Sequence, residues 1–123
     1  MAVDVLIVDD SAAIRKILQR MLGQAGFTLG KILEAGDGLE ALEKMKSQGA
    51  HLVLSDINMP NMDGIQLLHE LKSSAEYRHI PVIMITTEGG EAKVMEAVQL
   101  GAAGYVRKPF TADHIKEKLS ALF

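Results

Sequence analysis

Residues 5–8 read Val-Leu-Ile-Val, and two aspartates, Asp9 and Asp10, follow them directly. A short unbroken run of apolar, largely β-branched residues is typical of a strand that is buried on both faces of a parallel sheet. Four further apolar runs occur along the chain, at residues 32–33, 52–54, 82–85 and 105–106. Segments of helical length separate these runs, so the pattern predicts five βα units in which helices cover both faces of a parallel sheet.

The segments between the runs carry helix signals. The first has a single apolar stripe from Ile14 to Ala25, and Gly26 stands where a helix commonly ends. The other four segments are expected to begin at about Asp37, Asp63, Glu91 and Thr111. The second and fourth helices should end at Gly49 and Gly101.

Length and composition limit the classes of protein to consider. The chain has 123 residues, a net charge of −3 and no cysteine. We expect residues 1–123 to form one domain, without disulfides, a zinc ribbon or a thiol nucleophile. The slightly acidic balance argues against a nucleic-acid partner. Asp4 interrupts the N-terminal apolar stretch, and no apolar run approaches the ~20 residues of a membrane span, so we expect a cytoplasmic protein without a membrane partner.

Polar residues follow the apolar runs at the edge of the sheet where ligands bind in parallel α/β proteins. Glu34 follows the second run, but we expect it on an edge strand, away from the others. The others are Asp9 and Asp10, then Asp56, Thr86 and Lys108. Taken singly, each has a structural explanation, such as a helix cap, a turn residue or a surface lysine. Three neighbouring carboxylates repel one another, however, and a divalent cation relieves that repulsion. Oxygen donors of this kind suit Mg²⁺, and Lys108 would face an anion that the metal positions.

Four segments together resemble the receiver domains of two-component response regulators, and in particular the stand-alone chemotaxis regulators of the CheY type. They are residues 8–11 (VDDS), 55–64 (SDINMPNMDG), 81–86 (PVIMIT) and 104–110 (GYVRKPF). They occur in the order of that family and span the chain. The resemblance implies a doubly wound (βα)₅ three-layer sandwich, flavodoxin-like or CheY-like, with strand order 2-1-3-4-5.

The resemblance also implies roles for individual residues. Asp56 would be the phosphoacceptor, and Mg²⁺ (or Mn²⁺) would be held by Asp9, Asp10, Asp56 and the backbone carbonyl of Asn58. The phosphoryl group would be bound by Thr86, the backbone of Thr87 and Lys108. Thr86 and Tyr105 would form the switch that responds to phosphorylation.

By the same resemblance, the chain is a monomeric, single-domain response regulator of a phosphorelay. A sensor histidine kinase, CheA-like or other, would supply the phosphoryl group. The fourth helix, fifth strand and fifth helix would then change their surface and bind a downstream protein, with chemotaxis as one candidate pathway. The protein would catalyse its own phosphorylation and dephosphorylation without being a turnover enzyme.

Three other functions are compatible with parts of the pattern. An aspartyl-phosphate phosphatase of the haloacid-dehalogenase type also uses carboxylates and Mg²⁺, but its motif is Asp-x-Asp, whereas Asp9 and Asp10 are adjacent. A flavodoxin-like cofactor binder would need a hydroxyl- and glycine-rich loop after Val8. A docking module that is never phosphorylated would not need the acidic residues and Lys108.

Overall fold

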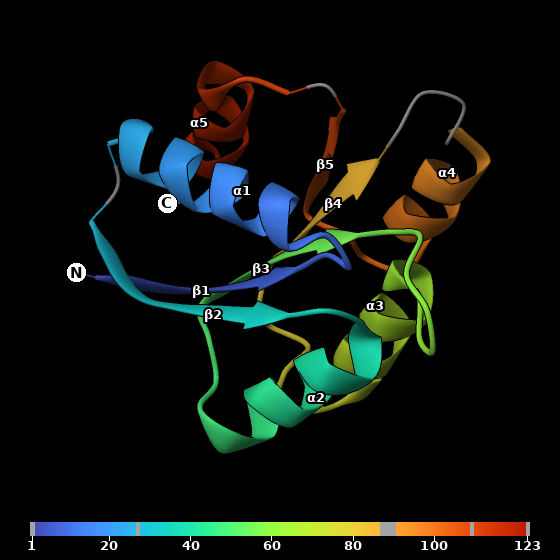
Figure 1. Cartoon of the computed structure of the whole chain (residues 1–123). Helices are drawn as coiled ribbons and strands as arrows, with labels where there is room; N and C mark the ends of the chain where they lie inside the picture. The colour runs from blue at the N-terminus through green and yellow to red at the C-terminus, as the bar shows by residue number, and fades with distance from the viewer. Residues whose placement is uncertain (1, 27, 87–90, 109, 123) are drawn as a thin grey trace.

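Five parallel strands form one sheet. The computed structural model of the chain describes residues 2–26, 28–86, 91–108 and 110–122. In chain order the strands are β1 (Val3–Val8), β2 (Leu29–Ala35), β3 (Leu52–Asp56), β4 (Val82–Thr86) and β5 (Gly104–Arg107). They lie side by side in the order β2-β1-β3-β4-β5, as Figure 1 shows, which confirms the predicted topology.

Helices alternate with the strands. They are α1 (Ala12–Gln24), α2 (Gly38–Ser47), α3 (Gly64–Ser73), α4 (Glu91–Gln99) and α5 (Ala112–Ser120). Asp37, Asp63 and Thr111 each accept a hydrogen bond from the backbone N–H three residues on, so the predicted starts of α2, α3 and α5 are confirmed. Ser11, with its hydroxyl 3.3 Å from the Ile14 nitrogen, caps α1. The N-cap of α1 is therefore Ser11 and not Asp10.

The sheet separates two hydrophobic layers (Figure 1). Alternate residues of a strand point to opposite faces, so Val5 and Ile7 pack with α1 and α5, whereas Leu6 and Val8 pack with α2, α3 and α4. Because both faces are covered, the three central strands are mostly apolar. Within the described residues, no helix is long and apolar enough to cross a lipid bilayer.

The strand register decides which residues meet at the carboxyl edge of the sheet. Val8 of β1 lies beside Ser55 of β3, and Asp56 lies beside Ile85 of β4. The residues immediately after β1 and at the end of β3 are therefore neighbours in space, although almost fifty positions separate them in the chain.

Candidate metal and phosphoryl site

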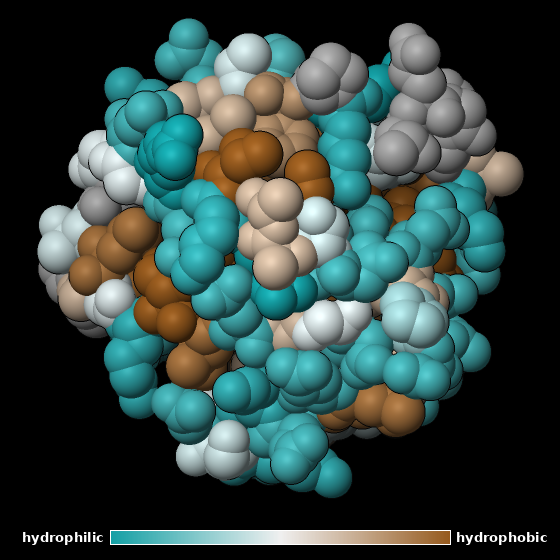
Figure 2. Space-filling model, in the orientation of Figure 1, coloured by the Kyte–Doolittle hydropathy of each residue, from teal (hydrophilic) through white to brown (hydrophobic). Residues whose placement is uncertain are grey.

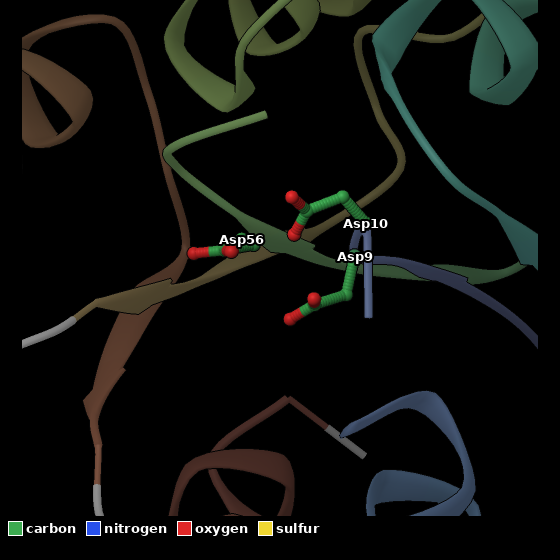
Figure 3. Close-up of side chains that lie close together, drawn as sticks. All are labelled: Asp9, Asp10 and Asp56. Atoms are coloured by element: carbon green, nitrogen blue, oxygen red, sulfur yellow. The ribbon is translucent and has the colours of Figure 1, made fainter. Parts of the chain in front are cut away.

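Three aspartates converge at the carboxyl ends of β1 and β3. One carboxylate oxygen from each of Asp9, Asp10 and Asp56 lies within 4.8 Å of the others, and Figure 3 shows the three side chains around a common space. Asp9 and Asp56 are buried, and Asp10 is exposed. Three oxygen donors at this separation, one of them open to water, match what Mg²⁺ prefers, because this ion takes a few carboxylates and keeps several water molecules.

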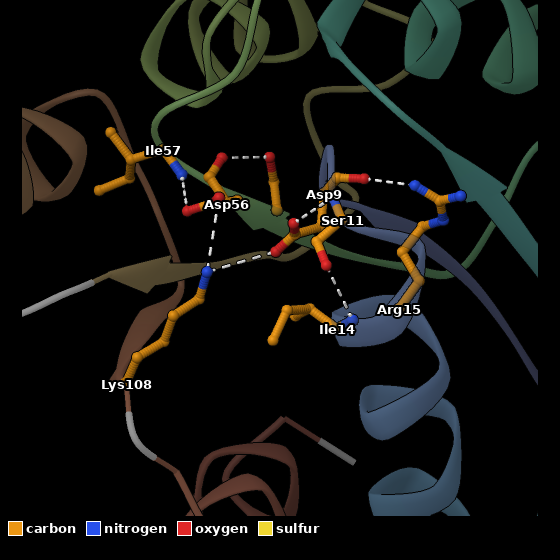
Figure 4. Close-up of polar contacts among 8 residues, drawn as sticks. Asp9, Ser11, Ile14, Arg15, Asp56, Ile57 and Lys108 are labelled. Atoms are coloured by element: carbon orange, nitrogen blue, oxygen red, sulfur yellow. Dashed lines mark hydrogen bonds and ion pairs between the residues drawn. The ribbon is translucent and has the colours of Figure 1, made fainter.

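Lys108 supplies a positive charge to this group. Its Nζ lies 3.4 Å from Asp9 Oδ2 and 3.5 Å from Asp56 Oδ2 (Figure 4). The lysine follows β5 directly, and its backbone nitrogen donates to the Thr86 carbonyl at 2.5 Å, which ties the end of β5 to the end of β4. One ammonium against three carboxylates leaves the pocket with an excess of negative charge, which favours a bound cation.

The environment of Asp56 disfavours its charged form when no metal is bound. Burial raises the pKa of the Asp56 carboxyl above its usual range, and the neighbouring Asp9 raises it further. The ammonium of Lys108 and the Ile57 N–H, which donates to Asp56 Oδ1 at 2.8 Å, lower that pKa in part. A cation near Asp56 would therefore favour the ionised form of this carboxyl.

Asp9 is held in place from both its side chain and its backbone. Its Oδ1 accepts a hydrogen bond from the Ser11 nitrogen at 2.8 Å. Its carbonyl accepts one from Arg15 Nη1 at 2.6 Å, and Arg15 Nε lies 2.9 Å from Glu34 Oε1 (Figure 4 shows the Arg15 bond to Asp9). The bond from Arg15 lowers the pKa of Glu34. Arg15 therefore connects Asp9 to Glu34 of the edge strand β2.

Sequence reasoning did not identify Arg15 as part of the site. The signal that could have found it is its position one helical turn after the Ser11 cap, which directs its side chain back toward the end of β1. Glu34 was expected to lie away from the other acidic residues because it follows the run of an edge strand. It is not part of the group formed by Asp9, Asp10 and Asp56, and its partners are Arg15 and Lys16.

The remaining predicted residues differ in burial and in their position in the fold. Thr86 is buried at the end of β4. Tyr105 pairs in register with Met84, so it lies on the same face of the sheet as Thr86, but its side chain is 38% exposed and Lys118 Nζ lies 5.5 Å from its ring centroid. Asn58 is exposed in the loop after β3. Thr87 lies outside the described residues.

Comparison with known proteins identifies the family of this chain. The family described as "Response regulator receiver domain" matches residues 5–120. The chain belongs to the response regulator receiver domain family. It is 44% identical over 119 residues to chemotaxis protein CheY-3 of Vibrio cholerae, covering 97% of this chain and 90% of that protein. It is 41% identical over 118 residues to chemotaxis protein CheY1 of Helicobacter pylori, covering 95% and 94% respectively.

Solved structures agree with the fold of this receiver domain. The chemotaxis response regulator CheY4 of Vibrio cholerae superposes with a TM-score of 0.87 at 32% identity, over 100% of both chains. The receiver domain of NtrX from Brucella abortus superposes with a TM-score of 0.84 at 32% identity, covering 97% of this chain and 98% of that one. This receiver domain is thus closely related to chemotaxis CheY proteins in sequence and in fold.

Proposed function

We propose that this receiver domain, taken as one unit over residues 1–123, accepts a phosphoryl group on Asp56 from a sensor histidine kinase. The observation that carries the proposal is that Asp56 lies 3.5 Å from a lysine ammonium and close to two further aspartates. Phosphoryl transfer depends mainly on positioning and on neutralising charge at the phosphoryl oxygens. A carboxylate nucleophile with an ammonium and a cation site beside it provides both.

The proposed metal ligands are the carboxylates of Asp9, Asp10 and Asp56 and the backbone carbonyl of Asn58. All four are oxygen donors, as Mg²⁺ or Mn²⁺ requires. When bound, the metal neutralises charge on the carboxylates and on the incoming phosphoryl oxygens. Ser11 and Arg15 keep Asp9 oriented toward the site through their hydrogen bonds to its side chain and its carbonyl.

In the proposed reaction, a carboxylate oxygen of Asp56 attacks the phosphorus of a phosphohistidine. A phosphorus–oxygen bond forms as the phosphorus–nitrogen bond breaks, and the electron pair of that bond stays on the imidazole nitrogen, which takes a proton from water. The product is an acyl phosphate on Asp56. The ammonium of Lys108 already contacts the carboxylates of Asp9 and Asp56. It is therefore close enough to pair with an oxygen of a phosphoryl group on Asp56.

We propose Thr86 as the group that reports phosphorylation to the surface. Its hydroxyl would bond a phosphoryl oxygen, as would the backbone of Thr87, and Tyr105 would then turn toward the space that the Thr86 side chain leaves. A state change of this kind needs contacts that exist in only one state, and the new phosphoryl bonds provide them. Tyr105 is 38% exposed, so an inward turn of its ring would bury further apolar surface.

The proposed output surface consists of α4, β5 and α5. Two of these elements carry apolar side chains in contact with solvent: Met95 and Val98 of α4 are 60% and 51% exposed, and Tyr105 of β5 is 38% exposed. Exposed apolar side chains on adjacent elements are typical of a surface that binds another protein. The similarity to two chemotaxis proteins supports a downstream partner in chemotaxis for this chain.

We propose that the kinase docks in a surface hollow that Lys108 shares with the Asp56 site. Its volume is about 510 Å³, and it is lined by Ile14, Ile17, Met21, Lys108 and Phe110. Figure 2 shows apolar surface on the side of the molecule where α1 and α5 lie. Because Lys108 belongs both to this hollow and to the Asp56 site, a protein seated here would bring a phosphohistidine close to Asp56. In this proposal the chain is a phosphoacceptor and turns over no separate substrate.

Labelling with a small phosphodonor tests the proposal directly. Wild-type protein incubated with Mg²⁺ and acetyl phosphate should gain one phosphoryl group by intact mass, and the adduct should be removed by hydroxylamine, as expected for an acyl phosphate. Asp56→Asn should gain none, and chelation of the metal should suppress labelling of the wild type. Asp113→Asn makes the same chemical change on an exposed residue of α5 and should label normally. Equal labelling of Asp56→Asn and wild type would refute the assignment.

A further inference from the structure

The loop between β3 and α3 contains a strained turn close to the site. The Met62 nitrogen donates to the Pro60 carbonyl at 2.6 Å, across Asn61, whose φ is +64°. A hydrogen bond between residues two apart around a positive φ is the pattern of a strained γ-turn. Among the described residues, Asn61 is the only non-glycine with a positive φ. Such a conformation persists only where neighbouring groups hold it.

The first turn of α2 holds this loop. Asn61 Nδ2 donates to Asp37 Oδ2 at 2.7 Å, and the Gly38 nitrogen donates to the Met62 carbonyl at 3.0 Å. Asp37 keeps its other oxygen for capping α2, through the Glu40 nitrogen at 2.9 Å. The Met62 side chain lies so close to Gly38 that a Cβ there would be 2.5 Å from Met62 Cγ. We name the Asn61–Asp37 and Gly38–Met62 hydrogen bonds the loop clasp.

The loop clasp lies three residues from a proposed metal ligand. At its base the loop is closed by the Gly64 nitrogen, which donates to the Ile57 carbonyl at 2.8 Å. Asn58 lies between this closure and the clasp, so the chain on both sides of its carbonyl is fixed. A short segment with both ends held has few orientations available to its peptide groups.

We propose that the loop clasp sets the orientation of the Asn58 carbonyl and thereby the affinity of the site for Mg²⁺, with Asp37 and Asn61 as positioning residues. This inference rests on the proposed function, since it takes the Asn58 carbonyl as a ligand. Without the clasp, the turn at Asn61 relaxes and the loop spends part of its time in conformations whose carbonyl does not face the aspartates. The apparent dissociation constant then rises in inverse proportion to the fraction of the loop that remains competent.

The size of the effect follows from the type of bond that is lost. A hydrogen bond to a charged group is among the stronger ones in proteins, but Asn61 is exposed and Asp37 half-buried, so water replaces part of the interaction. We expect the Mg²⁺ dissociation constant to rise about fivefold when the clasp is broken.

Exchanging the side chains of Asn61 and Asp37 gives a test whose expected result differs from the effect of charge alone. Asn61→Asp tolerates the positive φ and places two carboxylates face to face, which breaks the clasp. The variant also carries one more negative charge near the site, so simple electrostatics would tighten Mg²⁺ binding, whereas loss of the clasp should weaken it. Adding Asp37→Asn restores the net charge and the bond with its direction reversed, and asparagine caps a helix as well as aspartate does.

Titration of the metal-free proteins with MgCl₂ by calorimetry measures the effect. Asn61→Asp and the uncharged variant Asn61→Gly should each bind Mg²⁺ about fivefold more weakly than wild type, and the exchanged double variant should return to within about twofold of it. Tighter binding by Asn61→Asp, unchanged binding by Asn61→Gly, or failure of the exchange to restore affinity would overturn the clasp proposal and leave the proposed function intact. Absence of Mg²⁺ binding by the wild type would overturn both.

Discussion

Replacing Lys108 by methionine tests whether its charge stabilises the buried aspartates. Methionine keeps most of the apolar stem and removes only the ammonium. In the wild type, that ammonium lies 3.4 Å and 3.5 Å from the carboxylates of Asp9 and Asp56, whose side chains are 1% and 9% exposed. With an effective dielectric constant of about 20, each pair contributes about 5 kcal/mol of attraction before desolvation is counted.

The net effect on stability is smaller than that sum. The lysine loses part of its hydration in the folded protein, where its side chain is 21% exposed. Breaking a buried ion pair by removing one partner costs about 3–5 kcal/mol. Since water reaches this pocket, we expect Lys108→Met to lower the free energy of unfolding by about 3 kcal/mol at pH 7 without metal, which is about 1.5 M in the urea midpoint.

The loss of stability in Lys108→Met should be smaller at lower pH and in the presence of Mg²⁺. Removal of the ammonium raises the pKa of Asp56 further, because the ammonium is the largest influence that lowers it. At pH 5 more of the Asp56 carboxyl is then protonated, so fewer unpaired negative charges remain and the difference from wild type should shrink. Saturating Mg²⁺ should also reduce the difference, since it supplies positive charge to the same carboxylates.

Urea unfolding followed by far-ultraviolet circular dichroism measures this effect, because the chain has no tryptophan. The assay is run in chelator at pH 7 and pH 5, and at pH 7 with Mg²⁺. Lys116→Met removes the same charge from an exposed position on α5 and should change the free energy of unfolding by at most about 0.5 kcal/mol. If Lys108→Met unfolds at the same urea concentration as Lys116→Met in chelator at pH 7, the electrostatic reasoning is refuted.

Two further substitutions test the packing and the charge at Asp56. Gly64→Ala should lower the free energy of unfolding by about 3 kcal/mol in urea, because its Cβ would overlap the Asp56 carbonyl oxygen and lie 2.9 Å from Ile57 Cα. Gly23→Ala, in α1 with nothing within 4 Å of the added Cβ, should instead raise it by about 0.5–1 kcal/mol, and equal effects would contradict the packing argument. Asp56→Asn should stabilise the metal-free protein. Folding raises the pKa of the Asp56 carboxyl, so its ionisation destabilises the folded state once the pH rises above the unfolded pKa of about 3.9. The gain in urea midpoint on Asp56→Asn should therefore be larger at pH 7 than at pH 4. A gain that is the same at both pH values would contradict this reasoning.

Helix boundaries could be predicted well from the sequence because their signals are local. Asp37, Asp63 and Thr111 cap the helices that they were expected to cap, since a capping side chain bonds a backbone N–H only three residues away. The end of α1 was likewise marked by Gly26, whose φ is +85°. The apolar run that marked the second strand covers only residues 32–33, whereas β2 extends over Leu29–Ala35, where pairing with β1 supplies the order that its own residues do not.

The candidate site was predicted only as a set of residues. That Asp9, Asp10, Asp56 and Lys108 share one edge followed from their positions after apolar runs, because parallel strands end on the same side of a sheet. Arg15 and the loop clasp were not predicted. Their partners lie 6 to 24 positions away, and no local pattern in the sequence encodes which side chains will meet across that separation.

The sequence by itself determined the family, the order of the elements and the chemical nature of the site, because apolar periodicity, capping residues and oxygen donors are properties of single residues and their near neighbours. Only the tertiary structure decided which groups surround each residue of the site. It set Lys108 between two buried carboxylates, braced Asp9 through Arg15 and fastened the β3–α3 loop to Asp37. The physical reason is that burial and Coulomb energy depend on distances between groups, and the fold alone decides those distances.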